Sequence, residues 1–284
     1  MIRLDAATVL LQWATGGLLF LWVTTRRREV GLGYGWLLRG TYLVLAVLAV
    51  VVGRAFDPEP VRDAASAGVA LAAGAALVVS VVRRQAGVAG QREEQGRRSA
   101  RVAAMTGIER EVAVRDPTAA EFPPALDLMA PAIGAVGLLA AALASGGPDA
   151  LAVLRILVGA AFLGAITDAM LLGHWYLVQP GLPRAPLLDL VRWVALIWPL
   201  EVVALLLPTG MVSVWVGTVD DGYNGLLGWF WAACALATIV LCAVTRAALR
   251  ERYYSAVMAA TGMLYLAILT AFGTDLVARA VLAG

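Results

Sequence analysis

The chain has 284 residues, of which 61% are hydrophobic and only 15% are charged, with a formal net charge of +2. A soluble domain carries roughly a quarter charged residues, so this composition excludes an ordinary soluble protein and indicates an integral membrane protein with a single domain, residues 1–284. The small net charge gives no reason to expect a nucleic-acid partner. The absence of lysine and the abundance of Ala, Val, Leu, Gly and Arg are typical of a GC-rich bacterial genome.

Eight apolar stretches follow one another along the chain. A membrane-spanning helix needs roughly 20 apolar residues, and stretches of about that length lie at 6–24, 34–53, 64–82, 126–145, 150–173, 187–207, 226–245 and 255–281. The first stretch is followed by its basic residues, which is the reverse of the order in a cleaved signal peptide. We therefore predict an all-α, polytopic membrane bundle of about eight transmembrane helices.

The arginines divide unevenly between the gaps. Sixteen of the 22 lie in alternate gaps, within residues 26–28, 83–115, 184–192 and 246–252. Short arginine-rich loops stay in the cytoplasm, so both termini are predicted on the outer side of a bacterial cytoplasmic membrane. The longest gap, 84–122, is predicted to be a basic cytoplasmic loop, either a solvated connector or a surface for a protein partner or anionic lipid.

The segment 218–225 joins two spans on the outer side. Its Asp220 and Asp221 precede Gly222, and Asn224 precedes Gly225. Asp-Gly and Asn-Gly dipeptides favour a turn, although two adjacent carboxylates beside an asparagine are also a candidate cation site. We predict the turn and no metal. Cys234 and Cys242, eight residues apart in one span, are predicted to be unpaired apolar fillers.

Charged groups inside spans are energetically costly and often mark functional sites. Counting about 1.5 Å per helical residue divides them into an inner and an outer layer. His174, the only histidine, lies near the cytoplasmic end of the fifth span, and Asp168 lies about 9 Å deeper on the opposite face. Other helices would have to join the two in one site. Arg39 and Arg192 are the candidate partners of Asp168.

The outer layer contains Arg155, Glu201 and Asp275. Glu201 follows Pro199, which removes a backbone donor and is expected to kink the sixth span beside a buried carboxylate. Arg155 is expected to neutralise Glu201 or Asp275, and Tyr265 to supply a hydroxyl between the two layers. Each buried pair could instead serve only to fix helix register.

Several chemistries are excluded. One histidine excludes a bis-histidine haem inside the bundle, and no spacing supports a single-histidine haem with Met170 as its second ligand. The absence of lysine excludes a retinal Schiff base. No HExxH, Walker, CxxC or GxSxG motif occurs, so metalloprotease, nucleotide hydrolase and serine hydrolase functions lack support.

The hypothesis we favour is a membrane subunit of a respiratory or electron-transfer system that interacts with quinone and moves protons. A histidine at a span end has the proton chemistry that quinone reduction or oxidation needs. The residues predicted to act in catalysis are His174, Asp168 and Tyr176. Those predicted to contact quinone are His174, Trp175, Arg39 and Arg192. Those predicted to form a proton or transport pathway are Arg155, Glu201, Asp275 and Tyr265.

Two alternatives stay open. The first is a secondary transporter or channel for a small solute or ion, which Pro199 beside Glu201 favours. The second is a structural or assembly subunit of a membrane complex. In every case we expect membrane lipid as surroundings and a protein partner at the cytoplasmic loops.

Overall fold

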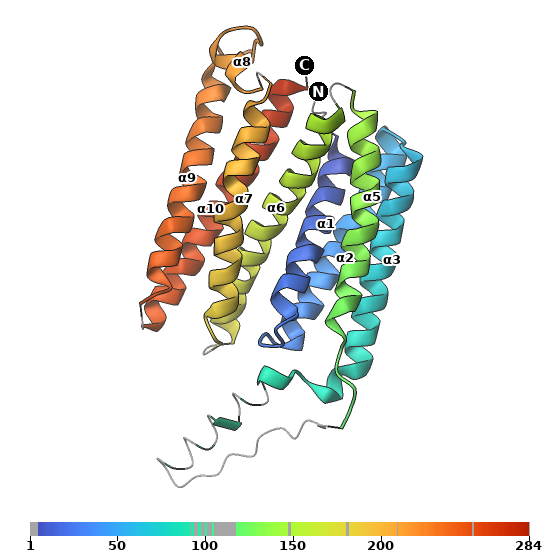
Figure 1. Cartoon of the computed structure of the whole chain (residues 1–284), viewed down its shortest axis with the longest axis vertical. Helices are drawn as coiled ribbons and strands as arrows, with labels where there is room; N and C mark the ends of the chain where they lie inside the picture. The colour runs from blue at the N-terminus through green and yellow to red at the C-terminus, as the bar shows by residue number, and fades with distance from the viewer. Residues whose placement is uncertain are drawn as a thin grey trace.

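The computed structural model describes residues 5–283 except 92, 94–95, 98–99, 101–103, 105–117, 147–148, 180–181, 209 and 252. Every element in this part of the chain is a helix, and eight of them are long (Figure 1). The long helices are α1 (Ala6–Thr25), α2 (Leu32–Phe56), α3 (Pro60–Val82), α5 (Met129–Ala144), α6 (Asp149–Val178), α7 (Ala185–Leu206), α9 (Leu226–Ala248) and α10 (Tyr254–Leu282). The short ones are η1 (Arg83–Ala86), η2 (Pro124–Leu128) and α8 (Val212–Trp215).

The long helices run side by side in one bundle (Figure 1). The start of α1 and the end of α10 lie at one end, which we call the terminal end. The links from α1 to α2 and from α9 to α10 lie at the opposite end, which we call the arginine-rich end. Most of the basic residues of the predicted loop 84–122 fall outside the described residues, and its described parts include η1 and residues 118–122.

Helices α1 and α6 form the centre of the bundle. In α1, 67% of the most apolar stretch is buried, and in α6 61%, against 33–39% in the other apolar helices. Helix α1 packs on α2, α5 and α6, while α6 also packs on α7 and α10. Side chains on these two helices are therefore the ones most completely removed from the surroundings of the protein.

A helix occupies each of the eight predicted stretches, which confirms the all-α bundle. Among the described residues, seven helical segments are long and apolar enough to cross a membrane. Helix α7 is of similar length but carries Asp189, Arg192 and Glu201 along its 22 residues. Cys234 and Cys242 are buried and unpaired, as predicted.

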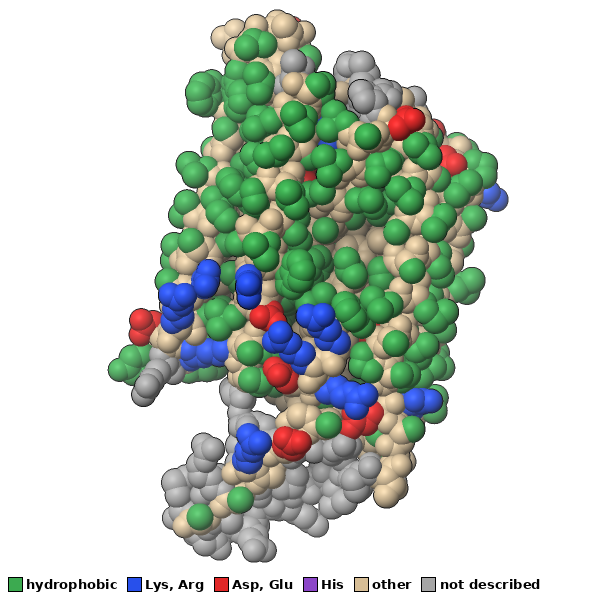
Figure 2. Space-filling view, in the orientation of Figure 1, with side chains coloured by type: hydrophobic (Ala, Val, Ile, Leu, Met, Phe, Trp, Pro, Cys, Tyr) green, Lys and Arg blue, Asp and Glu red, His purple; other side chains and the backbone are tan. Residues whose placement is uncertain are grey.

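The surface has the character expected for a protein embedded in lipid. On the face that Figure 2 draws, apolar side chains cover the side of the bundle and arginine side chains gather at the arginine-rich end. Large apolar residues such as Leu71, Trp229 and Leu269 are 75%, 68% and 69% exposed. A soluble monomer rarely exposes so continuous an apolar surface, so the fold is that of a multi-pass membrane protein.

The crossing of α1 and α6 depends on two glycines. A Cβ atom added to Gly16 would collide with the carbonyl of Ala160, and one added to Gly164 would collide with the backbone of Gly16. Small residues let membrane helices approach until their backbones touch. The two central helices of the bundle are therefore held at backbone contact.

We expect Gly164→Ala to destabilise the protein by about 1–3 kcal/mol, because the added methyl group overpacks this crossing. Gly40 on α2 is the matched control, since nothing lies within 4 Å of a Cβ built there. Gly40→Ala should be neutral or stabilise by up to about 1 kcal/mol through helix propensity. Thermal unfolding in mild detergent compares them, and equal stability of the two variants would contradict the backbone contact.

Candidate functional site

Four ionisable side chains meet near the terminal end of the bundle, and we call them the buried quartet. They are Arg155 of α6, Glu201 of α7, and Asp275 and Arg279 of α10. Glu201 and Asp275 are 0% exposed, and the two arginines are 6% and 1% exposed. Glu201 lies within electrostatic reach of the other three. The three residues predicted for the outer layer thus lie close together, and Arg279, which was not predicted to belong to that layer, joins them.

The two arginines of the quartet donate their hydrogen bonds to different kinds of acceptor. Arg279 donates to Asp275 through Nε at 2.7 Å and Nη2 at 3.0 Å. Arg155 donates to the backbone carbonyls of Ala204, at 2.9 Å, and Leu207. Asp275 thus has a partner one turn away on its own helix, and Arg155 satisfies carbonyls at the end of α7. Arg155 forms no hydrogen bond with Glu201 or Asp275 but lies within electrostatic reach of Glu201, so its neutralisation of that carboxyl group stays a prediction.

Glu201 accepts a hydrogen bond from no N–H or hydroxyl group at either carboxyl oxygen, and its polar neighbour within hydrogen-bonding reach is the carboxyl group of Asp275, which can bond to it only through a proton held by one of the two. A buried carboxyl group in this state is costly, since burial of a charge is tolerated only with pairing or hydrogen bonds. Pro199 lies two residues earlier inside α7 and cannot donate a backbone hydrogen bond. The unsatisfied carboxyl group therefore sits on a helix whose own hydrogen bonding is interrupted nearby.

Two further residues complete the surroundings of the quartet. A Cβ atom at Gly159 of α6 would lie 3.1 Å from Oδ1 of Asp275 and 3.1 Å from Nε2 of Gln12, so this glycine leaves room for the polar groups. Gln12 of α1 donates from Nε2 to the carbonyl of Ile156 at 2.7 Å, and its Oε1 has no partner. Gln12 was not predicted as part of the site, because an uncharged amide in an apolar helix is not distinguished by charge.

Asp168 lies in a separate site toward the arginine-rich end. Its side chain is 0% exposed. The hydroxyl of Tyr42 donates to Oδ1, the hydroxyl of Tyr34 donates to the backbone carbonyl of Asp168 at 3.3 Å, and Oδ2 has no partner. The prediction of Arg39 or Arg192 as the partner of Asp168 is wrong, because two tyrosines of α2 surround this carboxyl group instead.

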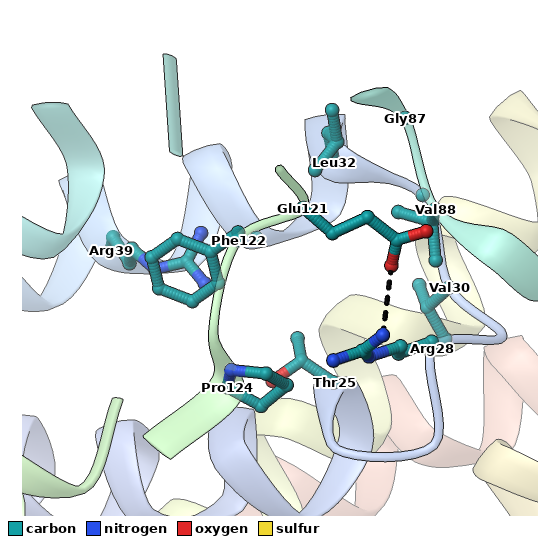
Figure 3. Close-up of a pocket in the computed structure, with 12 residues that line it drawn as sticks. Thr25, Arg28, Val30, Leu32, Arg39, Gly87, Val88, Glu121, Phe122 and Pro124 are labelled. Atoms are coloured by element: carbon teal, nitrogen blue, oxygen red, sulfur yellow. Dashed lines mark hydrogen bonds and ion pairs between the residues drawn. The ribbon is translucent and has the colours of Figure 1, made fainter. Parts of the chain in front are cut away.

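Arg39 is paired with Asp127 of η2. Its Nε and Nη2 donate to the two carboxylate oxygens at 2.8 and 2.7 Å, and both side chains are almost fully buried. The ring of Phe122 covers the guanidinium at 4.2 Å, as Figure 3 shows. On the other side of a hollow of about 30 Å³, Arg28 pairs with Glu121 at 3.2 Å. These contacts fasten the segment before α5 to α1 and α2.

His174 is exposed on α6, where its Nδ1 is hydrogen-bonded to the hydroxyl of Tyr265 on α10 at 2.9 Å. Tyr265 is 42% exposed and therefore does not lie between the two buried layers, as had been predicted. The prediction that His174 and Asp168 lie on opposite faces of α6 is confirmed, since one faces α10 and the other faces α2. No other helix joins them in one site.

The remaining residues predicted around His174 are engaged elsewhere. Tyr176 is buried and donates its hydroxyl to the carbonyl of Pro183 at 2.6 Å. Trp175 is hydrogen-bonded to Gln179 at 3.2 Å and lies beside Tyr34. Arg192 is exposed on α7 and faces α9. The residues predicted to form one quinone site are thus distributed over several places.

The segment 218–225 is a turn, as predicted. Asp221 accepts hydrogen bonds from the backbone N–H groups of Tyr223, Gly225 and Leu227 at 2.8–2.9 Å. Slight desolvation opposes ionisation, but these N–H groups outweigh it and hold the pKa of Asp221 below its ordinary value. Among the described residues, no three His, Cys, Asp or Glu side chains are placed to hold a metal ion.

Comparison with protein-family models, with curated proteins and with solved structures found no match for this chain. The geometry of the buried quartet, of Asp168 and of the His174–Tyr265 pair therefore carries the functional conclusions.

We expect Arg39→Met to destabilise the protein by about 3–5 kcal/mol, because it leaves the carboxylate of Asp127 buried and unpaired. The double variant Arg39→Met/Asp127→Leu removes both charges and should recover most of the lost stability. Thermal unfolding in detergent measures both. A single variant within about 1 kcal/mol of the wild type would show that the pair is not buried as described.

Proposed function

We propose that this protein is a proton-coupled secondary transporter and that Glu201 carries the proton. The observation that supports this most directly is the burial of Glu201 with no donor to either oxygen, beside two arginines. Ionisable groups at this depth are rare in membrane proteins and commonly belong to ion pathways or proton relays. A purely structural role would be better served by a carboxylate paired as Asp275 is paired with Arg279.

The net charge of the buried quartet depends on whether Glu201 holds a proton. With all four side chains ionised, two positive charges face two negative charges and the cluster is neutral. Protonation of Glu201 leaves one net positive charge, which is costly in a medium of low dielectric constant. A proton on Glu201 therefore changes the forces on Arg155, the arginine that has no carboxylate partner.

Arg155 connects this change to the position of α7. When Glu201 is neutral, Arg155 is best satisfied by the carbonyls of Ala204 and Leu207, which it contacts here. When Glu201 is ionised, its carboxylate competes for the same guanidinium. Pro199 removes one backbone hydrogen bond of α7 near this point. The last turns of the helix can therefore move together with the side chain of Arg155.

The distribution of arginines along the chain suggests which end of the bundle faces the cytoplasm. We place the arginine-rich end in the cytoplasm of a bacterial inner membrane, following the positive-inside rule. Glu201 then takes its proton from the outer side. Asp168, with one carboxyl oxygen unpartnered, lies on the inner side as a second proton-binding group. Nine residues of α6 separate it from Gly159 beside the quartet, about 14 Å along the helix, so the two groups exchange protons only through water or a change of conformation.

The test uses the full chain in liposomes containing a pH-sensitive dye. A panel of organic cations, organic anions and neutral solutes is added against a pH gradient, and proton movement is recorded. We expect at least one solute to drive proton movement in the wild type and Glu201→Gln to reduce it to the level of empty liposomes. Glu251→Gln, which alters an exposed carboxylate outside the helices, is the matched control and should retain activity.

Infrared difference spectra at varied pH provide the second measurement. The wild type should show the carbonyl band of a protonated carboxyl group that Glu201→Gln removes. Absence of that band, together with solute transport that is unchanged in Glu201→Gln, would contradict the role of Glu201.

A second candidate function is favoured by the His174–Tyr265 pair. This pair is exposed on the side of the bundle, about 6 Å from the end of α6, where quinone headgroups meet the membrane interface. An imidazole and a phenol hydroxyl can hydrogen-bond to a quinone carbonyl and hold or release its proton. Under this proposal the protein is a quinone-interacting subunit of an electron-transfer system, with its redox partner at the arginine-rich end.

Quinone binding has its own test. Menaquinone and ubiquinone analogues are titrated into the purified protein, and lipid extracts are analysed for bound quinone. We expect His174→Phe and Tyr265→Phe each to weaken binding about tenfold, the loss of one hydrogen bond. Tyr254→Phe, at another exposed tyrosine of α10, should leave it unchanged. If neither quinone binding nor proton movement occurs and the protein co-purifies with an enzyme complex, the assembly-subunit alternative is favoured.

A further inference from the structure

A groove opens between α7 and α9 toward the arginine-rich end of the bundle. Its volume is about 370 Å³. Arg192 of α7 lines it on one side, and Arg246 and Arg250 line it on the other. The small side chains of Ala195, Ala243 and Ala247 leave the hollow between the two helices. Neither the quartet nor the His174–Tyr265 pair contributes to it.

The periodicity of α9 creates one wall of the groove. Ala243, Arg246 and Ala247 are three or four residues apart and share one face of α9, and Arg250 lies in the turn just after the helix ends at Ala248. Helix α9 packs along α10 and meets α7 over a much shorter stretch. The groove is therefore the space where α9 separates from its second neighbour.

The three arginines of the groove are exposed, and no ion pair joins them to any described carboxylate. Asp189, which precedes Arg192 by three residues, is already paired with Arg27 at 2.6 Å. Arginine side chains concentrate over this end of the bundle, directly below its apolar side (Figure 2). The groove thus has an apolar upper part and an uncompensated positive charge at its lower end.

We propose that this groove binds one anionic phospholipid, with its phosphate on Arg192, Arg246 and Arg250 and an acyl chain along the apolar walls. Basic pockets between membrane helices on the cytoplasmic side suit anionic headgroups, and guanidinium groups form paired hydrogen bonds to phosphate oxygens. Exposed Trp193 beside Arg192 marks the level of the headgroups, where tryptophan is enriched. An acyl chain fills the hollow that a soluble anion would leave empty.

A lipid in this position bridges α7 and α9. The two helices share few direct contacts, so the lipid supplies packing that the polypeptide lacks. Binding to the folded state alone raises stability with lipid concentration. The protein should therefore unfold at higher temperature with anionic lipid than with zwitterionic lipid.

The test titrates the detergent-purified full chain with dioleoyl phosphatidylglycerol or dioleoyl phosphatidylcholine and follows thermal unfolding and tryptophan fluorescence. We expect saturable binding of phosphatidylglycerol only. Arg192→Gln and Arg246→Gln should each weaken it about tenfold, the loss of one charge-assisted hydrogen bond. Arg54→Gln, at an exposed arginine near the terminal end, should leave it unchanged.

A second variant tests the acyl-chain part while keeping all three arginines. Ala243→Leu fills the groove and should also weaken binding, whereas Val240→Leu, on α9 but outside the groove, should not. Equal effects of phosphatidylcholine, an effect of inorganic phosphate equal to that of the lipid, or equal losses in Arg54→Gln and Arg192→Gln would each overturn the proposal. Lipid-free unfolding temperatures close to the wild type verify that the variants are folded.

Discussion

Charge neutralisation in a medium without water is the constraint on which the interior of this bundle depends. A buried charge is tolerated only when it is paired and hydrogen-bonded. Arg39 meets Asp127, Arg279 meets Asp275, and Arg62 meets both Asp5 and Asp63. The first and last of these pairings join different helices or the segments before them, so they determine how α1, α2, α3 and η2 fit together as well as cancelling charge.

Three buried ionisable groups of the described interior form no ion pair, whereas Asp63, which also leaves one oxygen without a donor, is paired with Arg62. Glu201 has no donor, Asp168 has one unpartnered oxygen, and Arg155 is satisfied by carbonyls instead of a carboxylate. A bundle able to pair Arg39 and Arg279 so well could have paired these groups by the same means. Buried groups that lack the partners found elsewhere in a fold tend to coincide with functional sites. The proposal that Glu201 binds a proton rests on these unpaired groups.

The positions of the helices were predicted well from the sequence, but the partners of the buried charged side chains were predicted poorly, and both results have one physical reason. Apolar length is a local property, and the stretch predicted at 150–173 became Asp149–Val178. Counting residues along a helix gives depth, but it does not give the direction in which a side chain points around the bundle. Arg39 and Asp168 were both predicted in one layer, and both lie toward the arginine-rich end, yet Arg39 faces η2 and Asp168 faces Tyr42. Asp127 and Arg279 were missed because they lie near the ends of apolar stretches.

Helix α7 contributes both to the buried quartet and to the groove. Its 22 residues carry three charged side chains, with Glu201 and Pro199 toward the terminal end and Arg192 toward the other. Arg155 of α6 holds its last carbonyls, and the groove toward α9 lies along its opposite end. A helix held by polar contacts at its ends, and by little direct packing on one side, can change position at smaller cost than α1 or α6. Those two are fixed at backbone contact by Gly16 and Gly164. The bundle therefore combines a rigid centre with one peripheral helix that carries both the carboxyl group proposed to bind a proton and one of the arginines proposed to bind lipid.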